Sequence, residues 1–160
     1  MKESPFGTSH DTRIMQAALR QARVAFRKGE VPIGAVVVGP DGTIISRGHN
    51  LIEKRQTQTA HAEIIALEKA ARKKSGWRLN GCWLYVTLEP CAMCVGLMRL
   101  SRIDGIVYGA PSPLFGGSLD TESSSSLYKV GAFQVVRGVA AQESADLLGS
   151  FFKERRENRE

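Results

Sequence analysis

The chain has 160 residues, of which 42% are hydrophobic and 24% are charged, and this length leads us to expect that residues 1–160 form a single domain. No run reaches the ~20 apolar residues that a membrane helix needs, and residues 1–15 lack the apolar stretch of a secretory signal, so we expect a cytoplasmic protein. The formal net charge of +6 favours polyanionic partners, although solvated surfaces often carry a similar excess.

The N-terminal part of the chain combines a helix signal with a hairpin signal. Apolar residues recur at helical spacing in residues 10–28, which predicts an amphipathic helix that ends at Gly29. Two β-branched runs, at residues 33–39 and 43–48, flank the turn sequence PDG at residues 40–42. We therefore predict a helix followed by a β-hairpin.

The middle of the chain alternates between helix and strand signals. An apolar helical face predicts a helix over residues 61–74, and residues 82–88 are typical of a strand. Pro90 is expected to open a short helix that ends near residue 99, because proline is preorganised for the first helical position. A fourth strand is predicted over residues 103–108.

The C-terminal part is predicted to hold a loop, a strand and a helix. Residues 111–131 include a serine run and indicate a loop, and residues 132–136 indicate a fifth strand. A helix is expected from about residue 143, with four apolar side chains on its core face: Leu147, Leu148, Phe151 and Phe152. Strands joined through helices predict an α/β fold with a mixed five-stranded sheet flanked by helices.

Two short segments contain residues that can carry chemistry. The first is the sequence TAHAE at residues 59–63, at the start of a predicted helix. The second is TLEPCAMC at residues 87–94, where a predicted strand leads into a helix. Helices that follow neighbouring strands can bring their N-termini together at one edge of a sheet. We therefore expect these two segments to share a site.

The ligand types in these segments indicate a catalytic zinc site. Cys91 and Cys94 lie at i and i+3 in the first turn of a helix, where the dipole favours thiolate, and His61 supplies an imidazole. Three protein ligands leave one zinc position for water, whereas structural sites use four. Glu63 is placed to move protons between that water and a substrate. Cys82 is expected to pack in the core rather than to supply a fourth ligand.

The H-x-E and P-C-x-x-C pattern resembles the zinc-dependent nucleobase deaminases. More of the chain resembles the bacterial tRNA-specific adenosine deaminases of the TadA type, and the similarity covers most of its length. The segments that carry this resemblance are EVPIGAV at residues 30–36, GHN at 48–50, TAHAE at 59–63, LYVTLEPCAMC at 84–94, SRI at 101–103, VYGA at 107–110 and, more weakly, FFKERR at 151–156.

The resemblance implies a three-layer α/β/α cytidine-deaminase-like fold and a hydrolytic reaction. His61, Cys91 and Cys94 would bind one Zn²⁺ per chain, and Glu63 would be the catalytic proton shuttle. Zinc-activated water would attack C6 of adenine, N1 would be protonated through Glu63, and ammonia would leave. The family product is inosine at the wobble position of a tRNA anticodon, and the family enzymes are usually homodimers.

Further residues match substrate-contacting positions of the family. Asn50 matches the asparagine that hydrogen-bonds the target nucleoside, and Ile33 and Leu88 match positions near the base pocket. In the C-terminal helix, Arg155 is a candidate phosphate contact and Phe152 a candidate for base stacking, although Phe152 fits a core position equally well.

The chain departs from the family pattern after Ala110. It reads PSPLFGGS at residues 111–118, where the family usually has charged residues and later an Asn-His-Arg-like segment. Two alternatives to an RNA substrate therefore stay open. The same chemistry could act on a free base or nucleoside such as guanine, cytosine or cytidine. The chain could also be a zinc-stabilised binding subunit without activity, which the presence of Glu63 disfavours.

Overall fold

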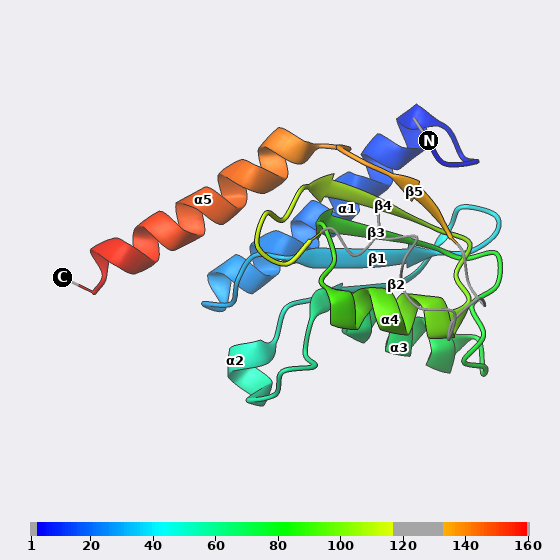
Figure 1. Cartoon of the computed structure of the whole chain (residues 1–160), viewed down its shortest axis with the longest axis horizontal. Helices are drawn as coiled ribbons and strands as arrows, with labels where there is room; N and C mark the ends of the chain where they lie inside the picture. Colours follow the sequence, from blue (N-terminus) through cyan, green and yellow to red (C-terminus); the bar gives the residue numbers. More distant parts are fainter. Residues whose placement is uncertain (1–2, 117–132, 160) are drawn as a thin grey trace.

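The computed structural model describes residues 3–116 and 133–159 of the chain, which form five helices and five strands (Figure 1). In chain order these are α1 (Thr8–Arg27), β1 (Gly34–Val38), β2 (Ile44–His49), α2 (Ile52–Arg55), α3 (Ala62–Lys73), β3 (Trp83–Leu88), α4 (Ala92–Ser101), β4 (Gly105–Ala110), β5 (Gln134–Val136) and α5 (Ala141–Glu157).

The strands form one mixed sheet in the order β2-β1-β3-β4-β5. Strand β1 pairs antiparallel with both β2 and β3, whereas β3, β4 and β5 run parallel to one another, with β3 at the centre of the sheet. Parallel neighbours need a crossover connection, and α4 supplies it between β3 and β4. The mixed five-stranded sheet predicted from the sequence is thus confirmed.

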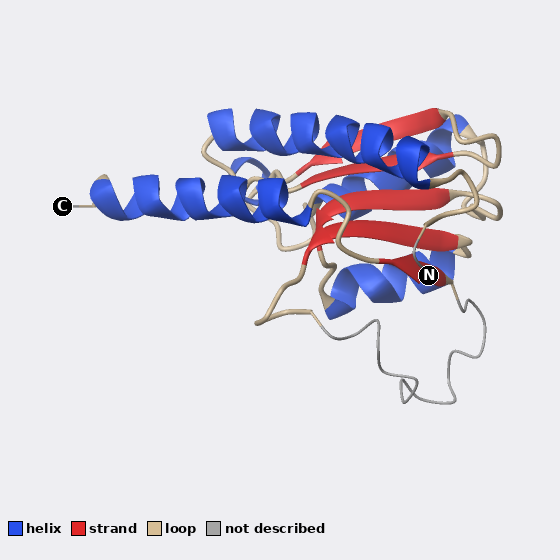
Figure 2. Cartoon of the chain, turned by 90° about the horizontal axis from the view of Figure 1, so that it is seen from above, coloured by secondary structure: helices blue, strands red, loops and turns tan. Residues whose placement is uncertain are grey.

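Helices cover both faces of the sheet and make three layers (Figures 1 and 2). Along β1, Val36 and Val38 pack against α1, while Ala35 and Val37 point to the opposite face and pack against α3. This alternation follows from the two-residue period of a strand. Because both faces carry a helix, β1 is buried along its whole length, and the α/β/α fold class is confirmed.

Most predicted helices and strands lie within two residues of their observed bounds. The strand predicted over residues 103–108 is shifted and spans Gly105–Ala110. Arg102 adopts a left-handed conformation that ends α4, and the Asp104 N–H then donates to the Cys82 carbonyl, so the chain enters the sheet only at Gly105. The predicted strand at residues 132–136 begins at Gln134, and residues 117–132 of the expected loop lie outside the described residues.

Two local predictions are wrong, and one short helix was missed. Pro90 does not open α4, because Cys91 is the extended N-cap residue and the helix begins at Ala92. The short helix α2 follows β2 and was not predicted, since four residues are too few for a periodic apolar pattern. Phe152 is 45% exposed and does not face the core, whereas Phe151 beside it is buried against Phe26. Among the described residues, none of the helices has the length and apolar character needed to cross a membrane.

Candidate metal centre

The predicted metal ligands meet where two helices begin at one edge of the sheet. His61 is the N-cap residue of α3, and Cys91 is the N-cap residue of α4, which follows directly from the end of β3. Both residues have extended backbone conformations, and neither side chain caps its own helix. The ring nitrogens of His61 and the sulfur of Cys91 are therefore not used for helix capping and can bind a ligand. Cys94, in the first turn of α4, is fully buried.

The three side chains form a cluster of the size that a metal ion needs. The Nδ1 atom of His61 lies 3.7 Å from the Cys91 sulfur and 3.5 Å from the Cys94 sulfur. A tetrahedral zinc site has a Zn–N bond of ~2.0 Å and Zn–S bonds of ~2.3 Å. Its nitrogen atom therefore lies about 3.6 Å from each sulfur atom. All three ligand atoms lie within 4.8 Å of one another. The residues present therefore fit zinc.

The same cluster has the electrostatics of a cation site. Hydrogen bonds from Cys94 and His61 lower the pKa of the Cys91 thiol to about 3, and the bond to Cys91 raises the pKa of His61. Hydrogen bonding to Cys91, together with burial, raises the pKa of Cys94. Thiolates are the form in which cysteines bind metals, so a cation at this site would be held by two thiolates and one imidazole.

Glu63 lies beside the ligands but is not one of the three. It sits in the first turn of α3, is 4% exposed, and interacts with the Cys94 thiol. Burial raises the pKa of its carboxyl to about 7, near the value at which a group both accepts and releases protons. The structure thus places Glu63 next to the cluster of His61, Cys91 and Cys94.

Two glycines let helices approach the sheet closely, and one of them, Gly48, lies under the helix that carries Glu63. A Cβ on Gly48 of β2 would lie 2.6 Å from the Ala62 carbonyl oxygen, in the first turn of α3. A Cβ on Gly34 of β1 would overlap the Ala18 carbonyl of α1. Because Ala62 separates His61 from Glu63, the contact at Gly48 sets the position of both functional side chains.

The residues that match substrate positions border the same edge. Asn50 is buried, and its N–H donates to the Ile33 carbonyl at 3.1 Å. The next N–H, of Leu51, donates to the carbonyl of Ala60, directly before His61. Leu88 is half-buried at the end of β3, three residues before Cys91. The structure therefore brings Ile33, Asn50 and Leu88 to the side of the sheet where the metal ligands lie.

The candidates in α5 have other contacts. Arg155 donates to the Gly29 carbonyl at 2.8 Å and lies over the Phe151 ring. The Phe152 ring lies 5.4 Å from that of Phe151. Cys82 is fully buried in the core at 3.6 Å from the Lys74 amine and does not belong to the ligand cluster, as the sequence predicted.

Two buried carboxylates that were not predicted hold the loops around the site. Glu30 accepts hydrogen bonds from the N–H groups of Glu53 and Lys54, which anchors the start of α2 close behind Asn50. Glu89 accepts a hydrogen bond from the Ser112 N–H at 2.9 Å. Both carboxylates lie within sequence segments that resemble the family. Their burial would have identified them as structural residues, but burial cannot be read from the sequence.

Comparisons with known proteins identify the family of the chain. The family model of the cytidine and deoxycytidylate deaminase zinc-binding region matches residues 8–110. The tRNA-specific adenosine deaminase of Bacillus subtilis (strain 168) is 42% identical over 94% of this chain and 94% of its own length. The protein of the same name from Streptococcus pyogenes serotype M18 is 38% identical over 97% of this chain and 98% of its own length.

A solved structure gives the same result in three dimensions. It comes from a study of A-to-I editing by tRNA:A34 deaminases at the wobble position of transfer RNA, and it superposes with a TM-score of 0.78. The two chains are 39% identical over 85% of this chain and 99% of the other. The chain therefore belongs to the cytidine and deoxycytidylate deaminase family, in the branch of the tRNA-specific adenosine deaminases.

Proposed function

We propose that the protein hydrolytically deaminates adenosine to inosine in RNA, at the wobble position of a tRNA anticodon. The observation that carries the proposal is the cluster of His61, Cys91 and Cys94 with the buried carboxylate of Glu63 beside it. The names of the related proteins support adenosine in tRNA as the substrate.

The proposed chemistry divides between a metal and one carboxylate. His61, Cys91 and Cys94 would hold one Zn²⁺ per chain, which when bound makes water a nucleophile near neutral pH. Glu63 would accept a proton from the attacking water and deliver it to N1 of the adenine ring. Its burial excludes bulk water from the proton path and keeps the carboxyl ready to exchange protons near neutral pH.

The substrate contacts are proposed from the residues at the same edge. The Asn50 side chain would hydrogen-bond the target nucleoside, and the half-buried Ile33 and Leu88 would line the base pocket. Phe152 and Arg155 of α5 are proposed as contacts to RNA beyond the target base. The exposed ring of Phe152 supports this role, because an exposed aromatic ring can stack on a base.

We also propose that residues 1–160 act as a single cytoplasmic domain that forms a homodimer. The outer face of α4 supports pairing with a second copy. Met93 and Leu100 lie seven residues apart on this helix and are 40% and 55% exposed. Leu97 lies between them and is half-buried. Exposed apolar side chains at this spacing form one stripe, which a second copy would cover.

A substrate panel tests the proposed function. Purified zinc-loaded protein is offered an anticodon stem-loop with adenosine at the wobble position, and separately adenosine, cytidine, cytosine and guanine. We expect inosine in the RNA and no ammonia from the free compounds. Glu63→Gln should abolish turnover and keep the metal. Turnover of free guanine or cytosine without RNA editing would instead establish the free-base activity that the altered segment at residues 111–118 left open.

A further inference from the structure

A basic groove lies between the edge strand β2 and the second half of α3. It has a volume of about 320 Å³ and is lined by Ile45, Ser46, Arg47, Lys69, Arg72 and Lys73. The Lys69 amine donates to the Arg47 carbonyl at 3.1 Å, and the Lys73 amine donates to the Ile45 carbonyl at 2.8 Å. These bonds fix both lysines along the edge of the sheet. Each ammonium group has three N–H donors, so donors remain for another ligand.

The two arginines of the groove keep their charge available. Both are exposed, and Arg72 pairs with Glu68 at 3.6 Å, with the two side chains 75% and 53% exposed. An exposed pair at this distance contributes little and is easily exchanged for another anion. The groove therefore offers two hydrogen-bonded ammonium groups and two exposed guanidinium groups to an anionic partner.

An aromatic and cationic cluster lies past the end of α3, where the chain leaves this helix. Trp77 is 54% exposed, which is unusual for the largest apolar side chain. The guanidinium carbon of Arg78 lies 4.2 Å from its ring centroid, and that of Arg102 lies 5.3 Å away. Stacking on the ring holds the planar guanidinium groups in place and leaves their N–H edges free to bind phosphate.

We propose that this α3 basic surface binds the sugar-phosphate backbone of tRNA outside the anticodon loop. The surface has two parts: the groove residues Arg47, Lys69, Arg72 and Lys73, and the cluster of Trp77, Arg78 and Arg102 past the end of α3. Fixed cations beside guanidinium groups with free edges match a chain of phosphates, and such contacts give affinity without reading sequence. The inference rests on the proposed function, because it assumes that tRNA is the substrate.

The position of the surface suits this role. His61 stands at the start of α3, while Lys69, Arg72 and Lys73 lie on its last two turns. A helix of 12 residues is about 18 Å long, so the surface lies roughly one helix length from the metal centre. An RNA with its target base at the metal centre must extend beyond it, and the α3 basic surface would hold the part that extends along α3.

Charge-reversal variants distinguish tRNA binding by this surface from substrate binding at the active site. The full-length double variant R47E/R72E is compared with R13E/R20E, whose arginines line a different groove on α1, on the opposite face of the sheet. We expect R47E/R72E to raise the Kd for whole tRNA at least ~10-fold and to reduce the slope of log K against log salt by about 2. Its Kd and kcat/KM for the isolated anticodon stem-loop should stay within about twofold of wild type, because single surface sites far from the chemistry act independently.

Two results would overturn the inference. In one, R47E/R72E binds whole tRNA as tightly as R13E/R20E does. This would show that the surface does not bind tRNA and serves another anionic partner. In the other, R47E/R72E loses affinity for the stem-loop as strongly as for whole tRNA. Thermal unfolding checks the fold of each variant, and the milder pair R47Q/R72Q gives the same comparison if the charge reversal destabilises the chain. Stem-loop editing by the wild-type protein tests the proposed function separately.

Discussion

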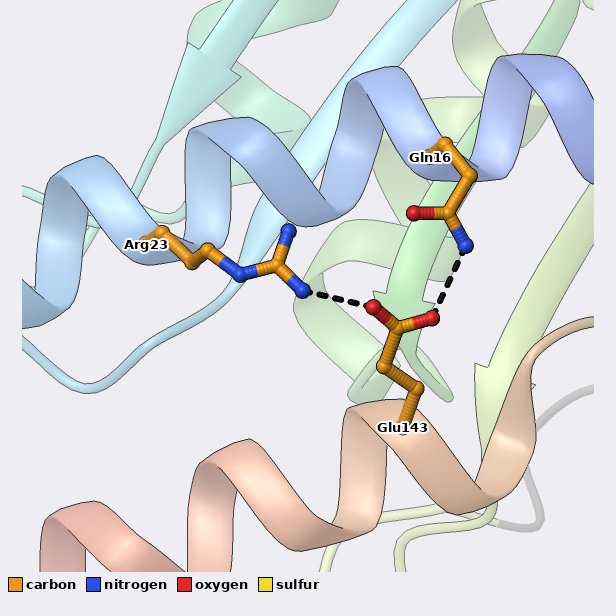
Figure 3. A network of polar contacts seen from close by, with 3 residues as sticks. All are labelled: Gln16, Arg23 and Glu143. Atoms are coloured by element: carbon orange, nitrogen blue, oxygen red, sulfur yellow. Dashed lines mark hydrogen bonds and ion pairs between the residues drawn. The ribbon is translucent and has the colours of Figure 1, made fainter.

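The carboxylate of Glu143, in the first turn of α5, receives a hydrogen bond from Arg23 of α1 at 2.6 Å (Figure 3). Its second oxygen accepts a hydrogen bond from Gln16 of the same helix at 2.8 Å. The three side chains link the first and last long helices of the chain. These hydrogen bonds hold α5 against α1, which covers one face of the sheet.

This network predicts a pH-dependent stability. The bonds from Gln16 and then Arg23 lower the pKa of Glu143, so its stabilisation is present above the unfolded value near ~4.3 and is lost as pH falls through the folded value. Because Glu143 and Arg23 are 41% and 40% exposed, we expect Glu143→Gln to cost less than ~1 kcal/mol at pH 7. Thermal unfolding from pH 3 to pH 7 measures the difference. The exposed Glu154→Gln is the matched control, and a Glu143 effect that persisted at pH 3 would contradict the account.

Gly48 is predicted to control the position of α3 at the metal centre. In Gly48→Ala the new methyl group would lie 2.6 Å from the Ala62 carbonyl oxygen, so helix and strand must separate. We expect a loss of about 1–3 kcal/mol of unfolding free energy and a weaker hold on metal. Gly149→Ala in α5 is the control, because its methyl group meets no atom within 4 Å and should stabilise the helix by about 0.4–1 kcal/mol. Equal effects of the two substitutions would refute the close approach at Gly48.

Glu30 is predicted to hold α2 in place behind Asn50. Replacing it with alanine leaves the N–H groups of Glu53 and Lys54 without their acceptor, at a cost of about 1–3 kcal/mol. Hydrogen exchange at the Lys54 amide should accelerate in Glu30→Ala and much less in Glu30→Gln, which retains one acceptor oxygen. Glu53→Ala changes only an exposed side chain of the same helix and should leave that exchange rate as it is. Unchanged exchange in Glu30→Ala would show that the carboxylate does not anchor α2.

The stripe on α4 predicts how the chain assembles. A charge in the middle of a buried apolar interface is costly, so Leu100→Glu should convert a dimer to a monomer in sedimentation equilibrium. Phe152→Glu places the same charge at an exposed apolar position of α5 and should leave the mass unchanged. A wild-type monomer, or a Leu100→Glu dimer of unaltered affinity, would rule out pairing through α4.

The fold could be predicted largely because local and long-range signals agree. The turn sequence at residues 40–42 lies between two β-branched runs, and the structure pairs those runs as the antiparallel β1 and β2. The apolar stripe of α1 and the fully buried pattern of β1 likewise match one helix packed on a covered sheet. Patterns that span many residues therefore predicted their elements well.

The sequence predicted only those site residues whose type by itself indicates their chemistry, such as metal-binding histidine and cysteine. His61, Cys91 and Cys94 were expected to meet, because helices that follow neighbouring strands begin at a shared edge, and they do. Glu30 and Glu89 could not be assigned, since what distinguishes a buried carboxylate from a surface one is its tertiary surroundings. The same holds for Phe152, whose exposure depends on where α5 leaves the body of the protein.

Metal analysis of the purified full-length protein tests the central claim most directly. After zinc loading and dialysis, we predict about one zinc per chain, as three protein ligands and water would hold it. Cys82→Ser should keep that zinc, because Cys82 is buried outside the cluster, whereas Cys91→Ser should lose most of it. Equal zinc in the two variants, or a well-folded wild-type chain that takes up no transition metal, would contradict the account.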